Sequence, residues 1–162
     1  MEIQPLVKEV ALELINKNIT IATAESCTGG LLAHYLTSIS GSSTFFIQGI
    51  ISYSNQAKES LLDVSKKTLE NHGAVSEQTA YEMAVGIRTK AATDIGISTT
   101  GIAGPTGGTA EKPVGLVYIG LASQNSMKVK QCTFTGNRIE NKESTCFEAL
   151  QMLKNLLETM TK

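Results

Sequence analysis

The segment Ile19-Thr20-Ile21-Ala22-Thr23-Ala24-Glu25-Ser26-Cys27-Thr28-Gly29-Gly30 joins a short apolar run to two glycines at the start of a helical pattern. The run over 19–24 is partly β-branched and predicts a buried strand. Helical spacing follows in the apolar residues Leu31, Leu32, Tyr35, Leu36 and Ile39. A strand that turns into a helix at glycines leaves the first N–H groups of that helix unpaired, and these groups suit a phosphate or a developing oxyanion. The alternative is a tight turn that needs glycine for its geometry alone.

The rest of the chain alternates between helical and extended patterns. Apolar periodicity predicts helices over residues 6–15, 31–39, 76–91 and 147–157, with two short helices between 54 and 72. Gly73 suits a left-handed cap for the second short helix, and Ser76 suits the N-cap of the helix that follows. Further strands are predicted over 45–53, 95–100, 115–122 and 127–135. The run 45–53 is apolar enough for a central strand, and the last two strands form a hairpin around 123–126.

Helices and strands alternate in the first part of the chain, whereas strands pair locally in the second part. This order predicts an α/β fold, a single-domain layered α/β/α sandwich with a mixed sheet. The sheet is expected to be parallel in its first part and antiparallel in a hairpin near the C-terminus. The length of 162 residues fits one domain over 1–162, large enough to bury a core without disulfides or metals.

The charge balance and the cysteines exclude several classes of protein. Fourteen basic residues face fifteen acidic ones, for a net charge of -1, and only Arg88 and Arg138 are arginines, which argues against a nucleic-acid partner. Cys27, Cys132 and Cys146 are odd in number and lack C-x-x-C spacing, so neither a disulfide framework nor a zinc site is indicated. No leader and no membrane span is indicated by the sequence. We therefore expect a cytoplasmic protein with no membrane partner.

Tyr53 and Lys58 follow the second predicted strand, in Tyr53-Ser54-Asn55-Gln56-Ala57-Lys58. Sites in such sheets gather at the carboxyl ends of strands, and Ser26 lies just beyond the end of the neighbouring strand, so Lys58 could reach it. A desolvated lysine can lose its proton near neutral pH and act as general base for a serine, and Tyr53 could relay or donate a proton. The alternative is that Lys58, one of twelve lysines, solvates a helix.

Histidine and cysteine chemistry are the rival hypotheses. His34 and His72 have no acidic partner nearby in sequence, and the surroundings of Ser26 lack the G-x-S-x-G pattern of the nucleophile elbow. Cys27 is the rival nucleophile, because a position near a helix N-terminus lowers the pKa of a thiol. Adjacent residues in an extended chain point opposite ways, so only one of Ser26 and Cys27 is expected to face the site.

A glycine-rich loop, Gly101-Ile102-Ala103-Gly104-Pro105-Thr106-Gly107-Gly108-Thr109, follows the strand over 95–100. Its backbone N–H groups could surround an anion, although it matches neither a Walker A loop nor a dinucleotide fingerprint. Arg138 could add a forked donor to a phosphate, and Ser42 and Ser43 offer further hydroxyls. The alternatives are a long mobile connection for the loop and a simple turn for the two serines.

Six motifs in this order closely resemble the CinA C-terminal domain family. The resemblance extends over nearly the whole chain, and stand-alone members of this length resemble the PncC-like nicotinamide-nucleotide amidohydrolases. Longer members carry a further N-terminal domain, which we expect this chain to lack. The motifs are Thr23-Ala24-Glu25-Ser26-Cys27-Thr28-Gly29-Gly30, Gly41-Ser42-Ser43, Tyr53-Ser54-Asn55-Gln56-Ala57-Lys58, Gly73-Ala74-Val75-Ser76, Gly101-Ile102-Ala103-Gly104-Pro105 and Lys112-Pro113-Val114-Gly115.

The resemblance implies an amidase that hydrolyses nicotinamide mononucleotide to nicotinic acid mononucleotide and ammonia in pyridine nucleotide salvage. It implies Ser26 as nucleophile, Lys58 as its base and Tyr53 as an assisting hydroxyl, with no metal and no cofactor. It further implies that the loop at Gly101, Ala103 and Gly104 and the segment around Arg138 hold the nucleotide, and that the protein forms homo-oligomers. Thr106 departs from the family, because many members have an acidic residue after the Gly-Pro.

Three hypotheses therefore stand. The first is the Ser/Lys amidase, in which the N–H groups near Thr28, Gly29 and Gly30 stabilise the oxyanion. The second is a catalytically inactive nucleotide-binding or assembly module of the same family. The third is a cysteine hydrolase built on Cys27, which predicts that Cys27→Ala is inactive and Ser26→Ala active.

Overall fold

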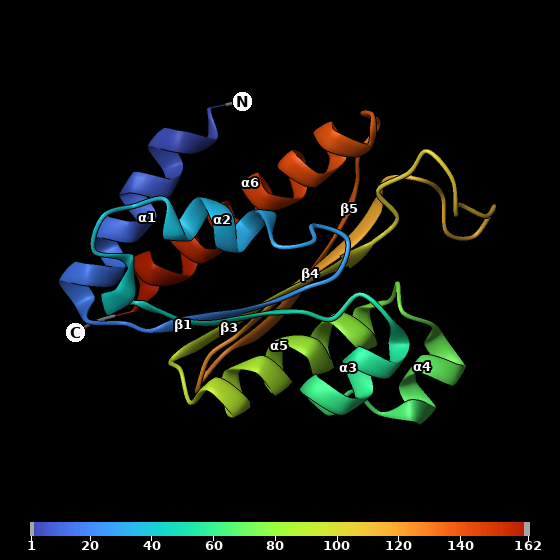
Figure 1. Ribbon diagram of the computed structural model, residues 1–162, viewed down its shortest axis with the longest axis horizontal. Coiled ribbons are helices and arrows are strands. Elements are labelled where there is room, and N and C mark those ends of the chain that lie inside the picture. Colours follow the sequence, from blue (N-terminus) through green and yellow to red (C-terminus); the bar gives the residue numbers. More distant parts are fainter. Residues whose placement is uncertain (1, 161–162) are drawn as a thin grey trace.

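The computed structural model describes residues 2–160 and shows, within them, one five-stranded sheet between two layers of helices (Figure 1). The strand order is β2-β1-β3-β4-β5. The first three strands are parallel, and β4 and β5 pair antiparallel to their neighbours. The predicted layered α/β sandwich with a mixed sheet is therefore confirmed. The elements are α1 (Ile3–Lys17), β1 (Ile21–Glu25), α2 (Leu31–Thr37), η1 (Ser42–Thr44), β2 (Phe46–Ile51), α3 (Asn55–Leu62), α4 (Lys66–His72), α5 (Glu77–Ala91), β3 (Ile95–Gly101), β4 (Leu116–Ala122), β5 (Met127–Thr133) and α6 (Arg138–Thr159).

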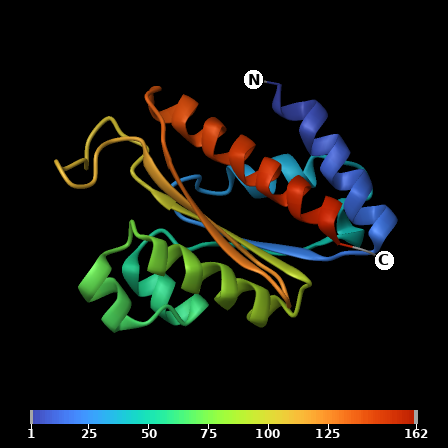
Figure 2. The same ribbon diagram turned by 180° about the vertical axis from the view of Figure 1, so that it is seen from behind.

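The two helical layers cover opposite faces of the sheet. Figures 1 and 2 show α1, α2 and α6 on one face and α3, α4 and α5 on the other. Side chains of β1 alternate between the two cores: Ile21 packs in the core beneath α1, α2 and α6, whereas Ala22 and Ala24 pack in the core beneath α3 to α5. Every residue of β1 is buried, as expected for a strand covered on both faces.

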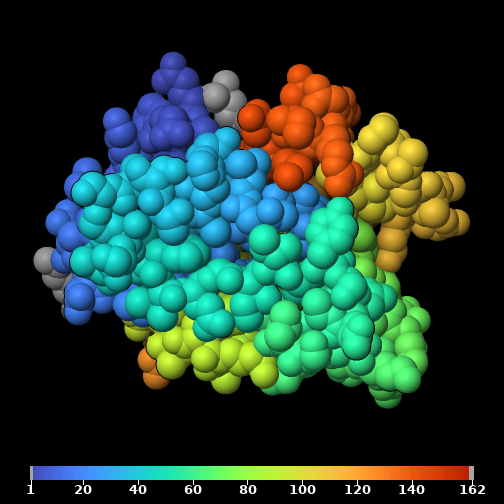
Figure 3. Space-filling model, viewed as in Figure 1, coloured from blue at the N-terminus to red at the C-terminus, as the bar shows by residue number. Residues whose placement is uncertain are grey.

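The prediction that residues 45–53 form a central strand is wrong. β2 is an edge strand that pairs only with β1 among the described strands, and Ile47 and Ile51 are 51% and 55% exposed. The apolar pattern gave the wrong position because hydropathy indicates that a segment can be buried. It does not indicate whether one strand or two pair with that segment. In the space-filling view the cyan and teal atoms around β2 lie uncovered at the front of the molecule (Figure 3).

α6 begins much earlier than its apolar periodicity indicates. Asn137 forms a capping box: its side chain accepts bonds from the N–H groups of Ile139 and Glu140, and the Glu140 carboxylate accepts from the Asn137 N–H. The cap extends the helix to Arg138, through two turns that lack the apolar periodicity of the later ones. Arg138 thus stands on a rigid helix rather than on a loop.

The caps around α5 follow the sequence prediction in one case and not in the other. Ser76 accepts a bond from the Thr79 N–H, as an N-cap does. Gly73 has the expected positive φ of 77°, but its ψ of 173° leads the chain into an extended conformation rather than the left-handed helical one. The turn from Gly73 to Ser76 consequently projects Ala74 and Val75 towards the carboxyl ends of the strands, where both line a pocket.

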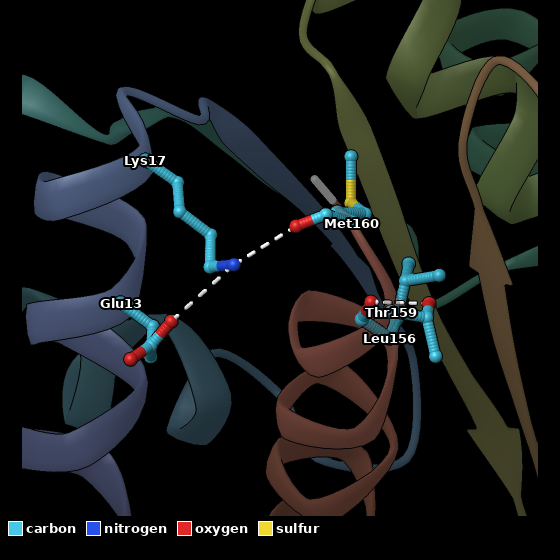
Figure 4. Close-up of polar contacts among 5 residues, drawn as sticks. All are labelled: Glu13, Lys17, Leu156, Thr159 and Met160. Atoms are coloured by element: carbon cyan, nitrogen blue, oxygen red, sulfur yellow. Dashed lines mark hydrogen bonds and ion pairs between the residues drawn. The ribbon is translucent and has the colours of Figure 1, made fainter. Parts of the chain in front are cut away.

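The end of α6 farthest from Arg138 is tied to α1 (Figure 4). Lys17 Nζ donates to the Met160 carbonyl at 2.9 Å and lies 3.7 Å from the Glu13 carboxylate. Lys154 Nζ also donates to Glu9 at 2.8 Å. These contacts hold the long helix across its face of the sheet. No helix within residues 2–160 is long and apolar enough to cross a membrane.

Candidate active site

The carboxyl ends of the parallel strands bring the candidate nucleophile and base together. Ser26 follows β1 directly, and its N–H donates to the Thr99 carbonyl of β3 at 2.9 Å. On the other side, the Ser52 N–H donates to the Glu25 carbonyl at 2.9 Å, so β2 stays beside β1 to its end. Ser54 then caps α3, which carries Lys58 back over the strand ends. The site therefore rests on three paired strands and a capped helix.

Ser26 and Lys58 form a direct hydrogen-bonded pair. The Lys58 Nζ lies 2.9 Å from Ser26 Oγ and donates to the Ser52 carbonyl at 2.8 Å. The Lys58 side chain is 1% exposed, and this burial lowers its pKa to about 8, against a smaller opposing effect of the nearby Cys27. A neutral amine beside a serine hydroxyl is the arrangement that a lysine general base requires.

Cys27 also lines the pocket at the strand ends, but its environment does not suit a nucleophile. Its side chain packs in the core beneath α1, α2 and α6. Burial raises the pKa of the thiol to about 12, although a hydrogen bond from Thr99 acts in the other direction. A thiol that stays protonated and packed in a core is a poor nucleophile. The geometry thus favours Ser26 of the two candidates.

Glu25 occupies the N-terminus of α2. Its buried carboxylate accepts bonds from the N–H groups of Gly30, Leu32 and Ala33 at 3.0, 3.1 and 2.8 Å, and from the Thr28 hydroxyl at 2.6 Å. A carboxylate at a helix N-terminus is favoured by the unpaired N–H groups and the helix dipole. The N–H of Gly30 is therefore engaged within the protein, although the sequence predicts that it meets the substrate.

Of the other hydrogen-bond donors in this turn, some are bonded within the protein and some are not. The Thr28 hydroxyl is buried against Glu25 and Thr99 and does not line the pocket, and the Gly29 N–H donates to the Ser26 carbonyl at 3.2 Å. Within residues 2–160, the backbone N–H groups of Cys27 and Thr28 donate to no backbone carbonyl. These two groups immediately follow the nucleophile, where an oxyanion hole is commonly built.

A pocket of about 270 Å³ opens beside the Ser26–Lys58 pair. Thr106, the departure from the family pattern, also lines it. Gly29, Gly30, Ser42 and Ser43 do not line it. Ser42 and Ser43 form η1 at the amino end of β2, whereas the pocket lies at its carboxyl end. Seven of the predicted site residues meet in its wall, namely Ser26, Tyr53, Lys58, Gly101, Ala103, Gly104 and Arg138.

Arg138 bridges two walls of the pocket. Its guanidinium donates to the Gly104 carbonyl at 2.7 Å and to the Tyr53 hydroxyl at 3.0 Å. Tyr53 is 62% exposed, so its ring forms part of the rim rather than of the buried pair. Since the phenol oxygen accepts from Arg138, its own proton remains free to be donated to a ligand.

The glycine-rich loop is held in place by α6 as well. Asn141 Nδ2 donates to the Ala103 carbonyl at 3.0 Å inside the protein. Gly104 has a φ of +87°, and a Cβ there would lie 2.5 Å from Val114 Cγ1, so only glycine fits. Lys112 Nζ reaches the His72 carbonyl at the end of α4, which fixes the far part of the loop. The loop is anchored at both ends rather than mobile.

Sequence reasoning missed Glu25, the Ser52 carbonyl, Asn141 and Thr100, which also lines the pocket. A carboxylate one residue before the candidate nucleophile and a few residues before a helix start was a signal for Glu25.

His34 and His72 do not line the pocket. Among the described residues, no group of three or more His, Cys, Asp or Glu side chains could hold a metal ion.

A mixed α/β/α sandwich with a buried Ser–Lys pair at the carboxyl ends of its parallel strands defines the class of this protein as a serine–lysine α/β domain. The model of the CinA C-terminal domain matches residues 3–157, and the chain belongs to that family. A relative from Thermoanaerobacter pseudethanolicus, named as a competence-damage inducible protein, is 52% identical over 151 residues, which are 93% of this chain and 37% of that protein. The chain thus spans little more than a third of the length of the curated relatives it matches.

Solved structures agree with this assignment. The competence/damage inducible protein CihA from Agrobacterium tumefaciens is 40% identical with a TM-score of 0.93, covering 95% of this chain and 94% of that one. A CinA superfamily protein from Klebsiella pneumoniae is 34% identical with a TM-score of 0.95, covering 99% of this chain and all of that one. The fold is therefore that of the CinA family.

Proposed function

We propose that this protein is a metal-independent amidohydrolase that converts nicotinamide mononucleotide to nicotinic acid mononucleotide and ammonia. The observation that carries the proposal is the contact of 2.9 Å between Lys58 Nζ and Ser26 Oγ, in a site where burial lowers the pKa of the lysine to about 8. Membership of the CinA family and the resemblance of its motifs to nicotinamide-nucleotide amidohydrolases supply the substrate class.

In the proposed first half-reaction, neutral Lys58 takes the proton of Ser26 as Oγ attacks the carboxamide carbon. The C–O bond forms, and the carbonyl electrons move onto the oxygen of a tetrahedral intermediate. When the intermediate collapses, the C–N bond breaks and Lys58 returns the proton to the departing nitrogen, which leaves as ammonia. An ester between the pyridine carboxyl group and Ser26 remains.

In the second half-reaction, Lys58 takes a proton from a water molecule that attacks this ester. The ester C–O bond then breaks, Lys58 returns the proton to Ser26 Oγ, and the acid product leaves. We assign the oxyanion to the backbone N–H groups of Cys27 and Thr28, because those of Gly30, Leu32 and Ala33 already bind Glu25. Tyr53, held by Arg138, can donate its proton to a substrate atom at the rim.

The proposal places the nucleotide between the anchored glycine-rich loop and α6. Arg138 supplies a charged donor there, and the Ala103 carbonyl is held by Asn141.

The proposed reaction needs no metal, and we expect it to occur in the cytoplasm. We also expect homo-oligomers, as the resemblance implies; the uncovered apolar edge of β2 is surface that such an assembly would bury.

The test is product formation from nicotinamide mononucleotide by the purified protein in the presence of a chelator. We expect ammonia and nicotinic acid mononucleotide in equal amounts, and no product from Lys58→Ala that remains folded. Lys154→Ala, near the end of α6 that lies away from the pocket, is the matched lysine control and should keep full activity. If the wild type binds the nucleotide without releasing ammonia, the non-catalytic binding module replaces the amidase.

A further inference from the structure

Beside the turn that carries Ser26, α6 contributes a lysine that has no partner among the described residues. Lys142 is half-buried, and its ammonium group neither donates a hydrogen bond nor forms an ion pair within residues 2–160. Its Nζ lies 3.7 Å from the point that a Gly29 side chain would occupy, over the turn that carries Ser26. A half-buried cation without an acceptor is costly unless a ligand supplies the negative charge.

Lys142 also stands beside Arg138. The two residues are four positions apart in α6 and therefore lie on the same face of the helix. Arg138 uses this face to reach Gly104 and Tyr53 at the pocket. The first two turns of α6 thus direct two cations towards the carboxyl ends of the strands.

The turn after Ser26 and the end of β2 link the surroundings of these two cations. Arg138 bonds Tyr53, which follows Ile51 by two residues, and Ile51 Cδ1 lies 3.1 Å from the point that a Gly30 side chain would occupy. Lys142 Nζ lies near the point that a Gly29 side chain would occupy. The Glu25 carboxylate touches this ring, because it accepts from the Gly30 N–H. We call the ring the α6 rim. It consists of Gly29, Gly30, Ile51, Tyr53, Arg138 and Lys142.

We infer that the α6 rim holds the phosphate monoester of the substrate and that Lys142, together with Arg138, supplies its counter-charge. This inference rests on the proposed function and names the residue that separates a nucleotide from the nucleoside lacking the phosphate. Gly29 and Gly30 both have a positive φ, and a side chain at Gly30 would also crowd Ile51. The glycine-rich loop then binds the remainder of the nucleotide rather than its phosphate.

A purely structural role for Lys142 is the competing explanation. Glu25 carries a buried charge on the far side of the same turn, and Glu143 is the next residue in α6, so Lys142 could serve only to balance them. In that case its loss would loosen the Ser26 turn and affect every substrate alike. Loss of a phosphate contact would instead affect only substrates that carry the phosphate.

The test compares nicotinamide mononucleotide with nicotinamide riboside, which lacks the phosphate, as substrates of Lys142→Met. We expect kcat/KM for the mononucleotide to fall tenfold or more, as for loss of a charge-assisted contact of about 1.5 kcal/mol or above, and kcat/KM for the riboside to change less than twofold. Lys142→Arg should restore most of the loss. Lys154→Met in the same helix is the control. An equal fall for both substrates, or no change for either, overturns the inference.

Equilibrium binding separates failure of this inference from failure of the proposed function. Calorimetric titration with nicotinic acid mononucleotide requires no turnover. Weaker binding to Lys142→Met than to the wild type supports the α6 rim even if the wild type releases no ammonia. Identical binding to both proteins overturns it even if the amidase is active. Inorganic phosphate, as competitor, should inhibit the wild type more strongly than Lys142→Met.

Discussion

At the scale of single residues, the proposed chemistry depends on Lys58. Its side chain is almost completely removed from water, so the charged form is disfavoured and the pKa is lowered to about 8. The cost of burying the amine is offset by two hydrogen bonds, to Ser26 Oγ and the Ser52 carbonyl. An ordinary surface lysine would stay protonated at neutral pH and could not accept the serine proton.

The pH dependence of activity follows from this pKa. Only neutral Lys58 can act as the base, so kcat/KM should fall about tenfold for each pH unit below 8 and level off above it. The measurement is kcat/KM for amide hydrolysis from pH 6.5 to 9.5, a window above the second ionisation of a phosphate monoester, which lies near pH 6. A flat profile across this window would contradict a lysine base.

The sequence predicted the proximity of Ser26 and Lys58 better than it predicted the partners of the N–H groups around them. Ser26 and Lys58 were found because each follows a strand that the apolar pattern reveals, and parallel strands end at one edge of the sheet. The hydrogen-bond partner of the Gly30 N–H could not be predicted from the sequence, because it depends on the rotamer of Glu25. Lys142 was missed because nothing in its own segment indicates that it lies over Gly29.

At the scale of elements, the Glu25 carboxylate joins β1 to α2 and so fixes the turn that carries Ser26. Glu25→Gln keeps the shape of the side chain but replaces one acceptor oxygen by an amide that cannot accept from an N–H. We expect a loss of about 1–3 kcal/mol in the free energy of unfolding, measured with urea, together with a lower kcat.

The matched control for this substitution is Glu82→Gln. Glu82 accepts bonds from the Ser65 N–H and the Thr68 hydroxyl at the start of α4, away from the pocket. This variant should lose some stability and keep its kcat. If Glu25→Gln also kept a full kcat while losing stability, Glu25 would have no part in positioning Ser26.

The bounds of the elements were predictable where one face is apolar. The first half of α6 escaped prediction, because its first turns are held by a capping box and present polar residues to the pocket. The position of β2 escaped it too, because strand order depends on how the chain crosses between strands and not on the composition of one strand. Both errors affect the site, since β2 and α6 carry Tyr53 and Arg138 to it.

At the scale of the whole molecule, the fold class was predictable from the alternation of helical and extended periods along the chain. One sheet serves both cores, and the pocket is formed by its carboxyl edge, α3, α6 and the glycine-rich loop. These parts lie far apart in the sequence. A ligand that joins them stabilises the folded state as a whole.

Thermal unfolding tests this linkage. A ligand at one hundred times its dissociation constant adds about 2.7 kcal/mol to the free energy of unfolding. For a chain of 162 residues this corresponds to a rise in Tm of roughly 5–10 °C. We expect this shift with saturating nicotinic acid mononucleotide. No shift at concentrations of nicotinic acid mononucleotide far above those expected to bind would mean that the nucleotide does not bind the folded site.

The most direct measurement of the central claim is ammonia release from nicotinamide mononucleotide by Ser26→Ala and Cys27→Ala, side by side with the wild type. Both variants change one small side chain in the same turn, and circular dichroism would verify that each is folded. We expect Ser26→Ala to lose at least a thousandfold in kcat and Cys27→Ala to keep activity within about tenfold, as for loss of the nucleophile against loss of a packed thiol. Activity in Ser26→Ala, with none in Cys27→Ala, would contradict the Ser26–Lys58 mechanism.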